Sequence, residues 1–155
     1  MKQFTELSPW RIRLFLLWKL PAAWFMGITM RSCDGKTAVS ALPYGWRSRN
    51  PFRSAYFAAQ CAAAELSTGI LALMHLQGRP PVSMLVIRME AEFFKKASET
   101  LLFTCEDGEA LLNTIQQAVE SDEARVFRAA STGRLPDGTE VARIWITWSF
   151  KKKRI

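Results

Sequence analysis

The sequence predicts an α+β fold, in which one long helix packs against five or six mostly antiparallel strands that curl around it. The first observation is an apolar, alanine-rich segment at residues 50–76, interrupted internally by Gly69 alone. The second is a series of short β-prone or alternating segments on both sides of that segment. The third is size: 155 residues, 49% hydrophobic and 23% charged, are typical of one globular domain, which we place at residues 1–155.

The chain opens with a predicted helix at residues 8–20. Ser8 and Pro9 form a start signal, because a capping hydroxyl is followed by proline in the first helical turn. Aromatic residues and arginines on this segment leave two readings open: binding to a membrane surface, or packing on the same chain or a partner. We favour packing, and Lys19 and Pro21 leave the apolar run short for a membrane span.

A β-hairpin is predicted next. Residues 28–33 and 37–42 are β-prone, and Asp34-Gly35 between them is a strong signal of a tight turn. An aromatic and basic loop at residues 43–49 then leads to the long helix.

Residues 50–76 predict a central helix. Asn50 is a capping residue, Pro51 fits the first helical turn, and Gly78 followed by two prolines ends the segment. Polar residues are spread along the whole segment, too many for a lipid-facing span. We therefore expect a core helix enclosed by the sheet, and no stable membrane insertion.

The second half of the chain predicts four strands and a short helix. The expected strands are residues 83–94, 99–105, 124–131 and 139–150, and the helix is residues 109–119. Alternation predicts one apolar face for residues 83–94, made of Leu85, Ile87, Met89, Ala91 and Phe93. In the last strand it predicts that the core-facing residues are Ala142, Ile144, Ile146, Trp148 and Phe150. A basic tail, residues 151–155, is expected to leave the fold.

Charge and cysteines limit the function classes. The net charge is +7, but the basic residues are dispersed and no zinc-finger, helix-turn-helix or RNA-binding signature accompanies them, so we expect no nucleic-acid partner. The three cysteines, Cys33, Cys61 and Cys105, lack metal-site spacing, and their odd number argues against a disulfide framework. We expect a cytoplasmic protein without a metal or cofactor. Because a single-layer sheet leaves one face uncovered, we also expect a homodimer, with a tetramer as the alternative.

Four stretches of the sequence look familiar together. They are LPYGWRSRNPFRSAYFAAQCAAAELSTG at residues 42–69, MEAEFFKKA at 89–97, FTCEDGEA at 103–110 and GTEVARIWITWSFKKK at 138–153. With them the chain resembles the hotdog-fold thioesterase superfamily, in particular small single-domain proteins similar to phenylacetate-pathway acyl-CoA thioesterases. The resemblance implies a hotdog fold, a long central helix wrapped by a curved sheet, and a dimeric or tetrameric assembly.

The resemblance also implies site residues. In related thioesterases the segment that enters the central helix carries an Asn or His, then a Gly-Thr or similar pair, then small residues, and then an Asp or Glu. Asn50 matches the first position, Ser54 the hydroxyl position and Glu65 the acid. The chain departs from that pattern at Arg53, where glycine is common, and at Phe57-Ala58, where many relatives carry two glycines that let helix N–H groups approach the thioester oxygen.

Helical spacing places Ser54, Cys61, Glu65 and Thr68 on one stripe of the predicted helix. Thioester hydrolysis needs a base or nucleophile and donors for the developing oxyanion. Glu65 could act in either role, or could instead form a structural ion pair across a dimer.

Other residues have supporting roles in this prediction. Backbone N–H groups near Arg53 and Ala55 are the expected oxyanion donors, and Asn50 would orient substrate or water. Cys61 has no histidine partner, so we expect it not to be a nucleophile. The remaining candidates, which either contact the phosphates of coenzyme A or face solvent, are Arg47, Arg49, Lys95 and Lys96.

Two functions from different classes follow. The first is hydrolysis of an acyl thioester carried by coenzyme A or an acyl carrier protein, with Glu65 as base or nucleophile. The alternative is non-catalytic binding of a fatty-acyl or other apolar ligand, favoured by the missing glycines and the apolar helix. A third, weaker hypothesis is binding of the basic tail to anionic lipid or nucleic acid.

Overall fold

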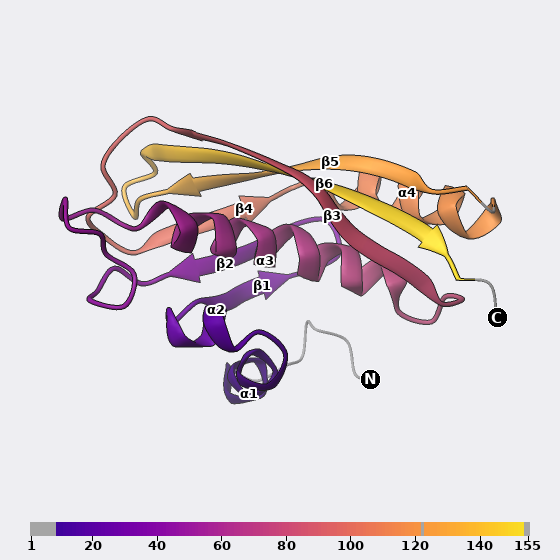
Figure 1. Ribbon diagram of the computed structural model, residues 1–155, viewed down its shortest axis with the longest axis horizontal. Helices are drawn as coiled ribbons and strands as arrows, with labels where there is room; N and C mark the ends of the chain where they lie inside the picture. Colours follow the sequence, from indigo (N-terminus) through magenta and orange to yellow (C-terminus); the bar gives the residue numbers. More distant parts are fainter. Residues whose placement is uncertain (1–8, 122, 154–155) are drawn as a thin grey trace.

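The computed structural model describes residues 9–121 and 123–153. Its elements in chain order are α1 (Pro9–Lys19), α2 (Pro21–Phe25), β1 (Thr29–Cys33), β2 (Ala38–Leu42), α3 (Phe57–Leu76), β3 (Val82–Phe93), β4 (Leu101–Cys105), α4 (Gly108–Glu120), β5 (Arg125–Arg134) and β6 (Glu140–Lys152). The strands form one six-stranded sheet in the order β1-β2-β4-β5-β6-β3, and every neighbouring pair is antiparallel. The sheet curves around α3 (Figure 1). The predicted α+β hotdog fold is confirmed.

The first third of the chain agrees closely with the prediction. α1 ends at Lys19, and Pro21 begins a short second helix, α2, that the sequence analysis did not predict. The predicted cap Ser8 lies outside the described residues. In the β1–β2 hairpin, Asp34 Oδ1 accepts hydrogen bonds from the N–H groups of Lys36 and Thr37, and the turn places Gly35 at φ 88°, in the left-handed region.

The central helix α3 is the core of the domain. By length and composition it could span a membrane, but 67% of its most apolar window is buried inside the fold, as in a core helix. Small side chains such as Ala63, Ala64 and Ala72 are fully buried and let the sheet approach the helix closely. Side-chain hydrogen bonds connect the helix to the sheet. In two of them, Ser40 Oγ donates to the Ala63 carbonyl, and the hydroxyls of Ser67 and Ser131 lie 2.8 Å apart.

The predicted start of the central helix was wrong. α3 begins at Phe57, seven residues after Asn50, and the intervening residues form turns. The Asn50 side chain bonds within this turn instead of capping a helix: its Oδ1 accepts from the N–H groups of Phe52 and Ser54. The backbone is also held from outside, because the Tyr56 N–H donates to the Ser48 carbonyl. Local signals favoured a helix, and contacts with distant backbone prevented it.

The predicted apolar face of residues 83–94 was wrong in its first half. The register of β3 against β6 shifts between Val86 and Arg88, so a bulge at Ile87 reverses the alternation. Directly paired residues lie on the same face of a sheet, and Met89 pairs with the buried Ile146. Met89, Ala91 and Phe93 therefore share the inner face with Val86, whereas Leu85 points outward.

The remaining elements fall close to their predicted positions. α4 packs beside β5, and the predicted core face of β6 is buried at all five positions. The predicted basic tail needs correction, because β6 continues through Lys152 and the Lys153 N–H donates to the Pro81 carbonyl. Residues 154–155 lie outside the described residues.

Candidate active site

An apolar cleft lies beside the middle of α3. Its volume is about 540 Å³, and it opens between the helix, α1 and the edge strand β3. Glu65 is the one acidic side chain among its lining residues. The others are Phe15, Lys19, Leu20, Leu66, Gly69, Ile70, Leu73, Gln77, Met84 and Trp148. Most of this wall is hydrocarbon, so the cleft suits an acyl chain with a carboxylate beside it.

The Glu65 side chain is half-buried and forms no ion pair with any residue that the structure describes. Desolvation by burial raises the pKa of this carboxyl above its ordinary value. Gly69, one turn further along α3, leaves the necessary room: a Cβ there would lie 3.4 Å from Glu65 Oε1 and 3.3 Å from Trp148 Cζ2. The Glu65 carboxylate and the Trp148 indole thus both lie close to Gly69, where any side chain would contact them.

Thr68 supports this wall rather than facing a substrate. Its hydroxyl donates to the Glu65 carbonyl at 3.1 Å and accepts a hydrogen bond from Trp148 Nε1 at 3.1 Å. These bonds fix the indole against α3. Cys61, also placed on the predicted stripe, is buried, and burial raises the pKa of its thiol, which disfavours the thiolate that a nucleophile needs.

Asn50 and Ser54 lie in a different hollow. Asn50 Nδ2 donates to Ser54 Oγ at 3.0 Å, so the two side chains hold one another in the turn before α3. They line a pocket of about 330 Å³ that shares no residue with the Glu65 cleft. Its other lining residues are Ala55, Phe57, Gln60, Phe93, Phe94, Lys95, Lys96 and Ala97. Arg49 and Arg53 line a third hollow with Asn50.

Gln60 is a candidate that the sequence analysis did not select. It is 5% exposed, its Nε2 donates to the Ala55 carbonyl, and its Oε1 has no hydrogen-bond partner among the described residues. About 100° per residue puts it roughly 140° around the helix from Glu65. The helical angle in the sequence already predicts that Gln60 and Glu65 face different sides of the helix. In the structure Gln60 lines the Asn50 pocket and not the Glu65 cleft.

The predicted oxyanion donors are already engaged. The N–H groups of Arg53, Ser54 and Ala55 donate to the Asn50 carbonyl, Asn50 Oδ1 and the Ala97 carbonyl. The first three N–H groups of a helix have no partner within it, so the corrected start of α3 moves the candidate donors to residues 57–59. Phe57 lines the Asn50 pocket, which places this helix end there.

The family model for a domain of unknown function, DUF4442, matches residues 9–150. The chain belongs to this family. No curated protein matches the sequence. The family description assigns no function. The Glu65 cleft and the Asn50 pocket are therefore the features that indicate the chemistry of this chain.

Solved structures similar to this DUF4442 domain include thioesterases. A protein of unknown function from Pseudomonas aeruginosa (PA5026), described as a probable thioesterase, has a TM-score of 0.78 at 14% identity and covers 94% of this chain and 97% of its own. The thioesterase HI1161 from Haemophilus influenzae has a TM-score of 0.72 at 11% identity, covering 98% and 96%. A provisionally named thioesterase from Shewanella oneidensis has a TM-score of 0.75 at 11% identity, covering 91% and 95%. At these identities the likeness shows the fold, and the finer resemblance to the phenylacetate-pathway branch stays a prediction.

Proposed function

We propose that this protein hydrolyses acyl thioesters, with Glu65 as the reacting carboxylate. The observation that carries the proposal is a half-buried carboxylate beside an apolar cleft of about 540 Å³. It has no ion-pair partner among the described residues, and desolvation raises its pKa. The acyl chain would lie along Leu66, Ile70 and Leu73, and the thioester carbonyl would stand at Glu65. The thioesterase names of similar structures support the same reaction class.

In the general-base route, Glu65 accepts a proton from a water molecule whose oxygen attacks the thioester carbonyl carbon. The tetrahedral intermediate then collapses with cleavage of the carbon–sulfur bond, and Glu65 returns the proton to the departing thiolate. In the nucleophilic route a carboxylate oxygen attacks the carbonyl carbon, the carbon–sulfur bond breaks and the thiolate leaves. Water then hydrolyses the mixed anhydride, which releases the acid and restores Glu65. Both routes need oxyanion donors. The lining of the Glu65 cleft offers two side-chain donors, the Lys19 ammonium and Gln77 Nε2, which is buried without a hydrogen-bond partner among the described residues. The free backbone N–H groups at residues 57–59, by contrast, lie outside this cleft.

A second copy of the chain would supply them. β3 ends the sheet, pairs only with β6 among the described strands, and leaves its inner-facing Val86, Met89 and Phe93 between 38% and 50% exposed. Met84, near one end of β3, lines the Glu65 cleft, and Phe93, at the other end, lines the Asn50 pocket. Antiparallel pairing of two β3 strands about a two-fold axis near Arg88 would set the Glu65 cleft of one copy beside the Asn50 pocket of the other. We therefore propose a homodimer with two composite sites.

Roles follow for the remaining candidates. In the composite site Gln60 Oε1 would orient water or substrate, and the N–H groups of residues 57–59 would stabilise the oxyanion. Lys95 and Lys96 lie at the pocket mouth with exposed side chains, where they would contact the phosphates of coenzyme A or of an acyl carrier protein. A cytoplasmic location suits such substrates.

The deciding experiment is thiol release from short, medium, long and aromatic acyl-CoAs by wild type, Glu65→Gln and the matched control Glu120→Gln. Removing a general base costs about 10²- to 10⁴-fold in rate, so Glu65→Gln should lose at least roughly 100-fold in kcat, while the exposed Glu120 should be dispensable. Equal rates for wild type and Glu65→Gln, or no turnover of any substrate, would refute the proposal.

The engaged N–H groups of residues 53–55 favour a second candidate, a non-catalytic binder of acyl chains. Mass spectrometry of the purified protein separates the two. Co-purified fatty acid or acyl thioester without turnover indicates a binder, and rapid hydrolysis by a ligand-free protein excludes it.

A further inference from the structure

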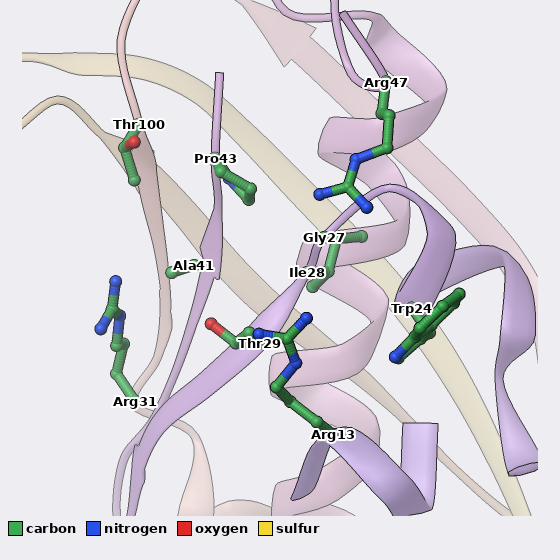
Figure 2. Close-up of a pocket in the computed structure, with 10 residues that line it drawn as sticks. All are labelled: Arg13, Trp24, Gly27, Ile28, Thr29, Arg31, Ala41, Pro43, Arg47 and Thr100. Carbon is green, nitrogen blue, oxygen red and sulfur yellow. The ribbon is translucent and has the colours of Figure 1, made fainter. Parts of the chain in front are cut away.

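A further cavity, of about 280 Å³, is lined by three arginines from three separate parts of the chain: Arg13 of α1, Arg31 of β1 and Arg47 of the loop before α3. In Figure 2, the guanidinium groups of Arg13 and Arg47 face one another across the segment from Gly27 to Thr29. None of the three forms an ion pair with a described residue. The cavity shares no lining residue with the Glu65 cleft.

The backbone is shaped to hold one of these arginines. Gly27 has φ 79°, and a Cβ added there would lie 3.2 Å from Arg47 Nη2 and 3.0 Å from Pro43 Cγ. The glycine therefore provides both the left-handed turn after α2 and the space in which the Arg47 guanidinium lies. Thr29 and Thr100 add hydroxyl groups to the lining. Guanidinium and hydroxyl donors around one small cavity suit a tetrahedral oxyanion such as a phosphate.

The segment that contributes these three arginines carries the excess positive charge of the chain. Residues 9–64 contain eight of the 21 basic residues but only one of the 14 acidic ones, Asp34. The rest of the chain holds 13 of each, so this segment accounts for the whole excess of +7. A surface with that field attracts polyanions or anionic membranes.

Exposed apolar side chains near the arginine cavity favour an anionic membrane over a nucleic acid as the partner. Trp10 and Leu17 lie within about 60° of Arg13 on α1, on the side away from the buried Leu16. Trp10 is 62% exposed and Leu17 is 40% exposed. Tryptophan and leucine next to cations are typical of segments that lie in the membrane interface, whereas leucine has no use against a nucleic-acid backbone.

The other side of the cavity repeats this pattern. Trp46, next to Arg47, is 72% exposed and contacts Phe25 at the end of α2 edge-to-face, with ring centroids 5.9 Å apart. Aromatic side chains thus flank the arginines on the α1 side and on the loop side. In Figure 1, α1 and α2 stand outside the curved sheet, so a flat surface could reach them.

We propose that this face docks on a membrane that contains anionic phospholipid, with a lipid phosphate in the arginine cavity and Trp10, Leu17 and Trp46 in the interface. The contact is peripheral and needs no membrane-spanning segment. It is independent of the proposed hydrolase activity, because it uses none of the residues of the Glu65 cleft or the Asn50 pocket.

Vesicle flotation tests the proposal, with vesicles of phosphatidylcholine alone and of phosphatidylcholine mixed with phosphatidylglycerol. The wild type should bind only the anionic vesicles. Arg13→Gln/Arg47→Gln should bind them roughly 30-fold more weakly, from about 1 kcal/mol per cation at the surface. The matched control Lys152→Gln/Lys153→Gln removes the same charge at the far end of β6 and should bind like wild type.

A tryptophan variant and thermal unfolding serve as further tests. Trp10→Ser keeps every charge and should also weaken binding, and thermal unfolding should show that all variants fold. Equal loss in the arginine and lysine variants, equal binding to neutral vesicles, or no vesicle binding would overturn the proposal. Binding of inorganic phosphate or of single-stranded RNA that requires Arg13 and Arg47, without vesicle binding, would overturn it as well and would identify the other class of anion.

Discussion

Glu65 is a carboxylate on a helix that is otherwise among the most buried parts of the protein. A half-buried acid without a described partner lowers the stability of the fold when it ionises, because water solvated it better in the unfolded chain. Gly69 and the Thr68–Trp148 hydrogen bond preserve the space around it. A local loss of stability of this kind is typical of functional residues, and it agrees with the role proposed for Glu65.

The raised pKa of Glu65 makes two pH profiles predictable. The ordinary value is 4.5, and the folded protein binds this proton more tightly than the unfolded chain does. The contribution of Glu65 to stability is therefore greatest below that value and is lost as pH rises through the folded-state pKa. Relative to wild type, Glu65→Gln should become more stable across this window and stay so above it. Thermal unfolding as a function of pH measures the difference.

The pH dependence of activity should be opposite to the pH dependence of the stability contribution of Glu65. As a base or nucleophile Glu65 must be ionised, so kcat/KM should rise across the same pH window. Glu106→Gln, at an exposed position, is the control and should follow wild type in both profiles. A Glu65→Gln variant less stable than wild type at neutral pH would show that an unseen partner compensates the carboxylate.

At the scale of elements, turn chemistry was predictable and the start of α3 was not. Asp34-Gly35 encodes its hairpin locally, because the aspartate bonds to the two following N–H groups it can reach. Asn50-Pro51 carries an equally plausible local signal for a helix. The start of α3 instead depends on two hydrogen bonds. The Tyr56 N–H donates to the Ser48 carbonyl, and the Ala55 N–H donates to the Ala97 carbonyl.

The junction of α4 with the β1–β2 hairpin is a close backbone contact that can be tested. The Gly108 N–H donates to the Lys36 carbonyl at 3.0 Å, and a Cβ at Gly108 would overlap the Gly35 carbonyl oxygen and the Lys36 backbone. Gly108→Ala should therefore destabilise the protein by about 2–3 kcal/mol in urea denaturation, since main-chain atoms cannot move aside like a side chain. Gly45→Ala, where a Cβ meets open space, should change stability by less than about 0.5 kcal/mol. Similar values for both would disprove this contact.

At the scale of the whole molecule, the hydrogen-bonding edge of β3 and its uncovered inner face are the features that call for a partner. α3 covers the inner face of the sheet over β2, β4 and β5 but leaves the β3 edge open. Joining two copies there would satisfy the edge and complete each reaction site. Fold, assembly and chemistry would then depend on the same strand.

The bulge in β3 provides a matched pair of variants for the dimer. Met89 faces inward and is 50% exposed, whereas Leu85 faces outward and is 61% exposed. Met89→Lys should raise the dimer dissociation constant by more than about tenfold, because a buried unpaired ammonium is costly, and activity should fall with it. Leu85→Lys should leave both unchanged. Light scattering and sedimentation across a dilution series provide the readout, and a monomeric wild type would disprove the composite site.

The sequence alone determined the architecture of this protein. A long apolar helix with interspersed polar groups, a turn-marked hairpin and the alternation in β6 are local patterns, and burial of apolar surface leaves few other ways to combine them. The sequence also identified Glu65 as a candidate, because an unpaired carboxylate in a buried apolar helix is energetically costly.

Only the tertiary structure decided where α3 begins, which side of β3 faces inward, and that Glu65 and Asn50 lie in separate hollows. Each of these depends on hydrogen bonds or register between residues far apart in the chain, and no local pattern carries that information. The gathering of Arg13, Arg31 and Arg47 around one cavity has the same origin: three dispersed charges became a site when α1, β1 and the loop before α3 met in space.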